Sequence, residues 1–155
     1  MRPRIALIGA LGALVLLVIA ACGGNDSGGG SSEQLTEAEY VAAADAICAE
    51  ADTKLDALGE PSPDAIGSFL RDGAEIAEEQ LDDLKALNGP DEIQETLDRA
   101  YELLGQLNDK AREAADAFDD GDISAANSLI DEITPLGEEA DQLATDIGLE
   151  VCSGN

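Results

Sequence analysis

The chain has 155 residues and a formal net charge of −26, and it contains no histidine and no tryptophan. A protein this acidic does not attract nucleic acid or an anionic membrane surface by charge. Without histidine, it also lacks the commonest general base and the commonest metal ligand. We therefore expect no nucleic-acid partner, and no chemistry that depends on an imidazole.

The first 22 residues combine positive charge, a long apolar run and a terminal cysteine. Arg2 and Arg4 are followed by residues 5–21, all of which are apolar or glycine. The run ends in Ile19-Ala20-Ala21-Cys22, an aliphatic residue, two small residues and a cysteine. This motif resembles the lipobox of bacterial lipoproteins, and the whole segment is typical of a secretory signal. We predict a signal peptide over residues 1–21.

The resemblance implies that Cys22 becomes the N-terminus of the mature chain and carries lipid. Two or three acyl chains would hold the protein stably at the extracytoplasmic face of the cell membrane. The membrane is then its first partner, through the lipid on Cys22. Two alternatives remain: an ordinary signal peptide with an incidental cysteine, or an uncleaved anchor, since the apolar run approaches the ~18–20 residues of a spanning helix.

Residues 22–33 follow the predicted cleavage site as a tether rich in glycine and serine. Such a composition is typical of a flexible linker with nothing to bury. Residues 34–155 are long enough for one small domain with one core. No stretch in them alternates with period two over the length of a strand, and alanine, leucine and acidic residues dominate.

Periodic apolar residues predict helices over residues 36–58, 63–87, 91–118 and 123–147. Thr36 and Glu39 form a capping box at the first start. Gly59 and Gly148 mark helix ends, and Gly89 is expected to cap the second helix before Pro90. Short connections between these helices predict an all-α, antiparallel up-down-up-down four-helix bundle.

Three further details of the helices follow from spacing. Ser62 and Pro63 are expected to cap and begin the second helix. Pairs at i,i+4, Glu95 with Arg99 and Arg112 with Asp116, are expected to interact weakly on the third. Pro135 lies inside the fourth, where it removes the hydrogen bond to the Asp131 carbonyl, so we expect a kink or short break there.

The acidic turn over residues 116–127 is the nearest approach to a metal motif. Gly121 is the sixth residue from Asp116, as in a calcium-binding loop. However, the third position is Phe118 and the twelfth is Asn127, where such a loop needs an oxygen ligand and a bidentate glutamate. An acidic turn between helices is the favoured interpretation, and we expect no metal site and no cofactor.

Cys48 and Cys152 are the only cysteines left once Cys22 carries lipid. A disulfide persists outside the cytoplasm, so we predict a Cys48–Cys152 bond. The tail after Gly148 would have to turn back along the bundle, with Leu149 and Val151 docking against it. The alternative is a buried, free Cys48 and a frayed Cys152.

Residues 44–51 and 148–152, together with the lipobox and linker, resemble a group of small lipoproteins of high-GC Gram-positive bacteria. The resemblance implies an extracytoplasmic four-helix domain with a disulfide, and it implies no activity. We expect a non-enzymatic domain with no catalytic residues, binding an envelope protein or wall component or serving a structural role. The alternative is a module that binds a small ligand or cation within the bundle or near Pro135, with Tyr40, Phe69, Tyr101 and Phe118 as candidate pocket residues.

Overall fold

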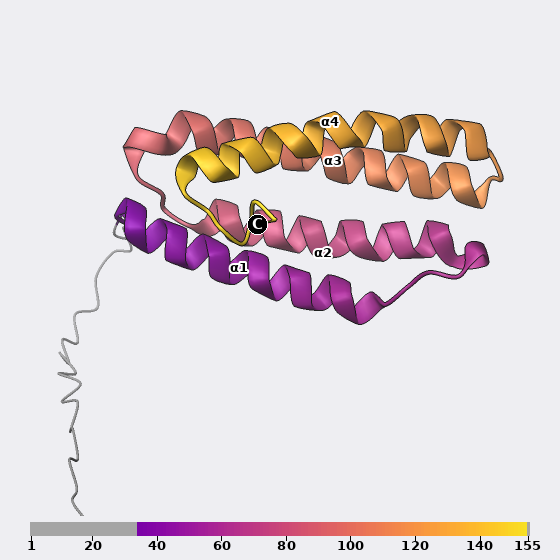
Figure 1. Ribbon diagram of the computed structural model, residues 1–155, viewed down its shortest axis with the longest axis horizontal. Helices are drawn as coiled ribbons and strands as arrows, with labels where there is room; N and C mark the ends of the chain where they lie inside the picture. Colours follow the sequence, from indigo (N-terminus) through magenta and orange to yellow (C-terminus); the bar gives the residue numbers. More distant parts are fainter. Residues whose placement is uncertain (1–33, 155) are drawn as a thin grey trace, which may run out of the picture. The chain divides into compact units, whose positions relative to one another are not determined.

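The computed structural model describes residues 34–154, which form an antiparallel up-down-up-down four-helix bundle (Figure 1). Within this range there is no strand, so the predicted all-α fold is confirmed. Short 3-10 turns, η1 (Pro63–Ala65) and η2 (Asp91–Ile93), lead into the second and third helices. The helices are α1 (Glu37–Leu58), α2 (Ile66–Ala86), α3 (Gln94–Asp119) and α4 (Ile123–Ile147). The predicted signal peptide, Cys22 and the linker lie outside the described residues.

Local sequence signals set several of the helix ends. The Thr36 hydroxyl accepts a hydrogen bond from the Glu39 N–H, and the Glu39 carboxylate accepts one from the Thr36 N–H at 3.0 Å. These bonds complete the predicted capping box. The Thr36 hydroxyl also donates to the Glu39 carboxylate at 2.7 Å, and this bond, followed by the one from the Thr36 N–H, lowers the pKa of Glu39. Gly59 and Gly148 have φ of +69° and +91°, a conformation that glycine adopts without steric cost.

The α1–α2 and α2–α3 connections differ from expectation in two respects. The Ser62 side chain makes no capping hydrogen bond, although Pro63 does occupy the first helical position. Gly89 does not cap α2, which ends at Ala86 with Leu87 as its C-cap residue. A Cβ at Gly89 would lie 2.7 Å from Leu97 Cδ1 and 3.3 Å from the Tyr40 ring, so glycine is needed here for close packing.

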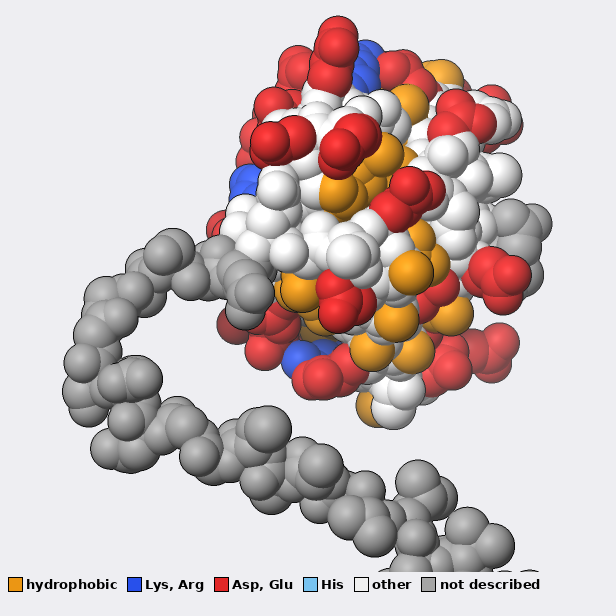
Figure 2. Space-filling model, turned by 90° about the vertical axis from the view of Figure 1, so that its left-hand side faces the viewer, with side chains coloured by type: hydrophobic (Ala, Val, Ile, Leu, Met, Phe, Trp, Pro, Cys, Tyr) orange, Lys and Arg blue, Asp and Glu red, His pale blue; other side chains and the backbone are white. Residues whose placement is uncertain are grey.

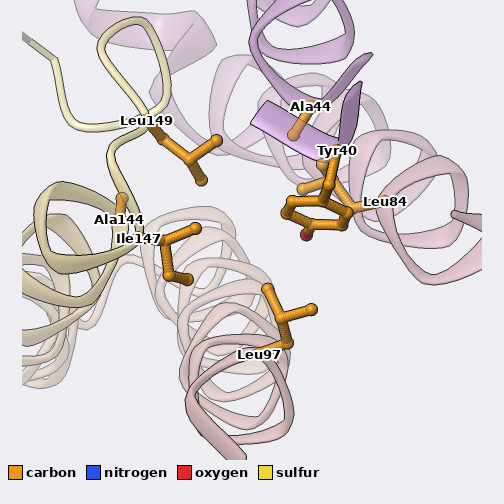
Figure 3. Packing of buried hydrophobic residues seen from close by; sticks show 7 residues of the cluster. All are labelled: Tyr40, Ala44, Leu84, Leu97, Ala144, Ile147 and Leu149. Atoms are coloured by element: carbon orange, nitrogen blue, oxygen red, sulfur yellow. The ribbon is translucent and has the colours of Figure 1, made fainter. Parts of the chain in front are cut away.

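A compact cluster of buried side chains joins α1, α2, α3 and α4 near the start of α1 (Figure 3). Tyr40 is 1% exposed and its ring lies beside Leu84. Leu149 comes from the segment after α4, and its side chain points into the cluster between α1 and α4. The full cluster is Tyr40, Ala44, Leu84, Leu97, Ala144, Ile147 and Leu149.

Pro135 does not break α4, which runs without interruption from Ile123 to Ile147. The predicted short break is therefore absent. Pro135 is exposed, so water can hydrate the Asp131 carbonyl that its ring leaves without a helical donor. The neighbouring Thr134 hydroxyl donates to the Ile130 carbonyl at 3.4 Å. An outward-facing proline is thus accommodated within a continuous helix.

Replacing Pro135 by alanine is expected to stabilise the domain, by up to about 3 kcal/mol, because the helix regains one hydrogen bond and loses the ring clash. Thermal unfolding of the two proteins measures the change. Glu138→Ala, one turn along the same helix, controls for the general effect of alanine. An unchanged or lower melting temperature would show that the proline is built into the packing of α4.

Candidate functional site

The boundary between α1 and α4 differs from the other three helix–helix boundaries. α3 packs extensively on α2 and on α4, and α1 packs on α2, whereas α1 and α4 make few direct contacts. After Gly148 the C-terminal segment turns back and lies between them (Figure 1). We call this boundary the α1/α4 seam, and residues 149–154 the C-terminal tail. The tail occupies the half of the seam near the start of α1.

A disulfide fastens the tail to α1. Cys48 and Cys152 are bonded across 104 residues of sequence, with their Cα atoms 5.3 Å apart. Cys48 is buried on the inner face of α1, as its position between Ala44 and Ala51 predicts. Leu149 is also buried, but Val151 is 37% exposed, so only one of the two expected apolar anchors docks. The disulfide itself supplies the second attachment.

The Asp45 carboxylate holds the backbone of the tail. It accepts hydrogen bonds from the N–H groups of Glu150, Val151 and Cys152, at 3.2, 3.0 and 3.3 Å. The Ser153 hydroxyl donates to the Leu149 carbonyl and closes the turn. Sequence reasoning missed Asp45, although its position three residues before Cys48, beside the apolar stripe of α1, was an available signal.

Replacing Asp45 by alanine is expected to destabilise the domain by about 1–3 kcal/mol, because three backbone donors lose their acceptor. The amides of residues 150–152 should also exchange with solvent faster, which hydrogen exchange measures. Asp45→Asn keeps one acceptor oxygen, so its stability and its exchange rates should lie between those of the native protein and those of Asp45→Ala. Asp52→Asn, an exposed carboxylate on the same helix, is the control. Unchanged exchange in Asp45→Ala would mean that the disulfide alone positions the tail.

A cavity of about 70 Å³ lies under the disulfide, within the bundle core. Tyr40 and Tyr101 both line the cavity. The Tyr101 hydroxyl donates its one hydrogen to the Leu84 carbonyl at 3.0 Å, so in the 2.9 Å hydrogen bond between the two hydroxyls Tyr40 is the donor. Burial, chiefly, raises the pKa of both tyrosines, which therefore remain neutral at physiological pH. The Gln80 amide donates to Cys48 Sγ at 3.1 Å. The cavity is mainly apolar, and these polar groups bond within the domain.

The half of the seam beyond the tail is open and apolar. We call it the distal groove, and its volume is about 210 Å³. Leu55 of α1 borders the groove at Gly73, one of the lining residues. A Cβ added to Gly73 would lie 3.7 Å from Leu55 Cδ2, which is ordinary van der Waals contact. Leu55 is 38% exposed, and Ile130 of α4 is 39% exposed one turn before Ile133. The groove is lined by Phe69, Leu70, Gly73, Ala74, Ala77, Leu107, Asn108, Ala111 and Ile133.

Asn108 is the one polar side chain in the lining of the distal groove. The residue is only 7% exposed. Within the described residues no fully buried side-chain nitrogen or oxygen lacks a hydrogen-bond partner, so the Asn108 amide is not an orphaned buried group. Phe69 also lines the groove, whereas Tyr40 and Tyr101 line the cavity under the disulfide. Three of the four candidate aromatic residues are thus divided between two places, and Phe118 lines neither of them. The position of Asn108 four residues after Leu104, on the core face of α3, was a signal that the sequence reasoning did not use.

Basic side chains join three of the four helix–helix boundaries. The structure describes every Lys and Arg residue of the chain apart from Arg2 and Arg4. Each of the described ones forms an ion pair with a neighbouring helix, with the exception of Lys85. Lys85 lies beside Gln94 and Asp98 at the boundary of α2 and α3. The pairs are Lys54 with Glu79, Arg71 with Asp116 and Asp119, Arg112 with Glu78, Arg99 with Glu139, and Lys110 with Glu132.

This pattern corrects the expected i,i+4 pairs on α3, because Arg99 and Arg112 reach neighbouring helices instead of Glu95 and Asp116. Across residues 34–154, no ion pair spans the α1/α4 seam. On the face shown in Figure 2, acidic side chains surround the hydrophobic ones and few basic ones appear. The seam is therefore the boundary at which carboxylates have no cation from the part of the chain that the structure describes.

The acidic turn after α3 has structural uses for its carboxylates. Asp116 and Asp119 pair with Arg71, and Asp122 accepts a hydrogen bond from the Ala125 N–H at the start of α4. Within residues 34–154 no group of three or more acidic or cysteine side chains could hold a metal ion. The turn fits the interpretation of a capped helix–helix connection.

None of the helices over residues 34–154 is both long enough and apolar enough to span a membrane. The chain matches no known protein family, no curated protein and no solved structure.

Proposed function

We propose that this protein is a lipoprotein, held at the extracytoplasmic face of the cell membrane through Cys22. Its helical domain is a non-enzymatic module that binds an envelope protein or a wall component. The observation that carries the binding role is the half-open α1/α4 seam with its apolar distal groove. The lipobox and the glycine-rich linker support the location, since they would present the domain away from the membrane surface.

The chemistry of the groove suits docking. Its lining is apolar except for Asn108, and exposed apolar side chains, Leu55 and Ile130, continue it toward the surface. Contiguous exposed apolar surface marks interaction sites in soluble domains. The tail already shows that an added segment can be held in the same seam.

Photo-cross-linking from the groove tests the proposal. We would place a benzophenone amino acid at Ile130 in the lipidated protein and irradiate intact cells. The matched control is Asp109, which is exposed on α3. A discrete adduct from position 130 that is absent from position 109 is expected. Equal adducts from both positions, or none from either, would argue against a binding role for the groove.

A second candidate function, binding of a small ligand, is favoured by the cavity under the disulfide. At about 70 Å³ it is roughly half the size of an engineered apolar cavity that binds benzene, so only a very small apolar molecule would enter. Thermal unfolding under xenon pressure distinguishes this role. A rise in melting temperature that is lost when Ala144→Leu fills the cavity would support it.

A further inference from the structure

Building on the proposed binding role, we infer the chemical class of the partner. We propose that the distal groove binds a cationic amphipathic helix of another protein. The apolar face of that helix lies on α2, α3 and α4, and its Lys or Arg side chains lie against the carboxylates that border the α1/α4 seam. Three observations carry the inference: the length of the groove, the charges at its edges, and the amide of Asn108.

The length of the groove fits a short helical contact. Its lining on α2 extends from Phe69 to Ala77, which is about 12 Å along the helix axis at 1.5 Å per residue. A helix that presents apolar residues at i, i+3 or i+4, and i+7 covers a similar length, about 10 Å. The groove also lies between antiparallel helices, in the place where a closely packed α1 would complete the bundle.

The edges of the groove supply negative charge. Cys48 and Ala140 line the same cavity, so α1 and α4 are level at these positions. Further along each helix toward the groove are the exposed carboxylates of Asp52 and Asp56 on α1 and Glu138 on α4. None of these three is in an ion pair with a described residue. At the other three boundaries such carboxylates pair with Lys or Arg, so a partner would supply the missing cations here.

Two other occupants are disfavoured by charge and composition. A second copy of this chain would bring more negative charge to an already acidic edge, since the whole chain carries −26 and loses two arginines with its signal peptide. Residues 23–32 of the linker contain no apolar side chain that could fill the groove. A partner with an apolar face and basic flanks would both fill the apolar groove and neutralise the acidic edge.

Asn108 gives the groove a specific polar contact. As the one polar side chain of the lining, its amide can donate a hydrogen bond to a ligand in the groove and accept one from it. Replacing Asn108 by leucine should therefore weaken binding of any partner that hydrogen-bonds to the amide, because leucine of similar size has no donor or acceptor.

The test uses the full exported chain with Cys22→Ser, which keeps the helical domain and removes lipid from the assay. The probes are three labelled peptides: an amphipathic helix with lysine flanks, the same apolar face with glutamate flanks, and a scrambled lysine peptide of equal charge. Fluorescence anisotropy at physiological ionic strength gives Kd. The lysine helix should bind at least about tenfold more tightly than either of the others.

Matched variants locate the contact. Ile130→Glu should weaken the lysine helix about tenfold even though it adds negative charge, because it places a carboxylate on the apolar surface. Val151→Glu adds the same charge at a residue of similar exposure, outside the groove, and should leave Kd unchanged. Asp52→Asn with Asp56→Asn should weaken binding, whereas Asp109→Asn with Glu113→Gln on α3 should not. Circular dichroism confirms that each variant is folded.

Each other outcome overturns the inference. Equal binding of the scrambled peptide, or an unchanged Kd in Ile130→Glu, would show that general charge attraction replaces docking in the groove. Tighter binding of the glutamate helix would reverse the class of partner. If no peptide binds while Ile130 still cross-links in cells, the binding role stands and the cationic helix is wrong.

Discussion

Removing the Cys48–Cys152 disulfide is expected to lower the free energy of unfolding by about 2–5 kcal/mol and to leave most of the helix intact. The bond closes a loop of 104 residues and fastens the tail that covers the core between α1 and α4. Without the disulfide, only the packing of Leu149 and the hydrogen bonds from residues 150–152 to the Asp45 carboxylate hold the tail in place. Packing among α2, α3 and α4 does not involve the bond, so helix content should persist.

Thermal unfolding of the exported protein with Cys152→Ser, beside unfolding of the native protein with and without reductant, measures this loss. Val151→Ala changes an exposed neighbour and serves as the control for the tail. The far-UV spectrum of the variant should stay close to that of the native protein at low temperature. Two titratable thiols in the denatured, unreduced protein would contradict the bond, and the tail would then rely on Asp45 and Leu149 alone.

Replacing Cys22 by alanine is expected to abolish lipid attachment completely and to free the mature protein from the membrane. In the proposed lipoprotein the Cys22 thiol takes the diacylglycerol, and alanine has no nucleophile to replace it. Metabolic labelling with a fatty-acid analogue, followed by separation of membrane and soluble fractions, measures both effects. Cys152→Ser should label as strongly as the native protein, because its thiol lies in the tail of the folded domain.

Other results would point to the alternatives for the N-terminal segment. Equal label in Cys22→Ala and in the native protein would remove the lipobox interpretation. Loss of label with full retention in the membrane fraction would favour an uncleaved apolar anchor over residues 5–21. If the native protein takes up no fatty-acid label and is released into the medium, the result would favour an ordinary signal peptide.

Several features of this protein are determined locally, and the sequence alone was sufficient to predict them. Apolar spacing defined four helices, because one buried face of a helix repeats every three to four residues. Thr36 and Glu39 interact within one turn, and Gly148 ends α4 through its own backbone conformation. The Cys48–Cys152 bond followed by elimination, since only two cysteines remained for an oxidising compartment.

The tertiary structure decided the features that depend on how distant segments are placed. Gly89 is required because Tyr40 and Leu97 close around it, and Asp45 matters because a tail more than a hundred residues away in sequence turns back onto α1. Arg99 has carboxylates within one turn on its own helix, yet it also pairs with Glu139 on α4. Spacing along one helix cannot show such partners, because the long Lys and Arg side chains reach across to neighbouring helices.

The half-open seam is the clearest case of this division. Every helix of the bundle has an apolar face, and those faces by themselves predict a closed core. Whether α1 covers α2, α3 and α4 along its whole length depends on how closely it approaches α4, and the tail occupies only half of that boundary. The distal groove and the exposure of Leu55 and Ile130 therefore arise from helix placement, which sequence periodicity does not encode.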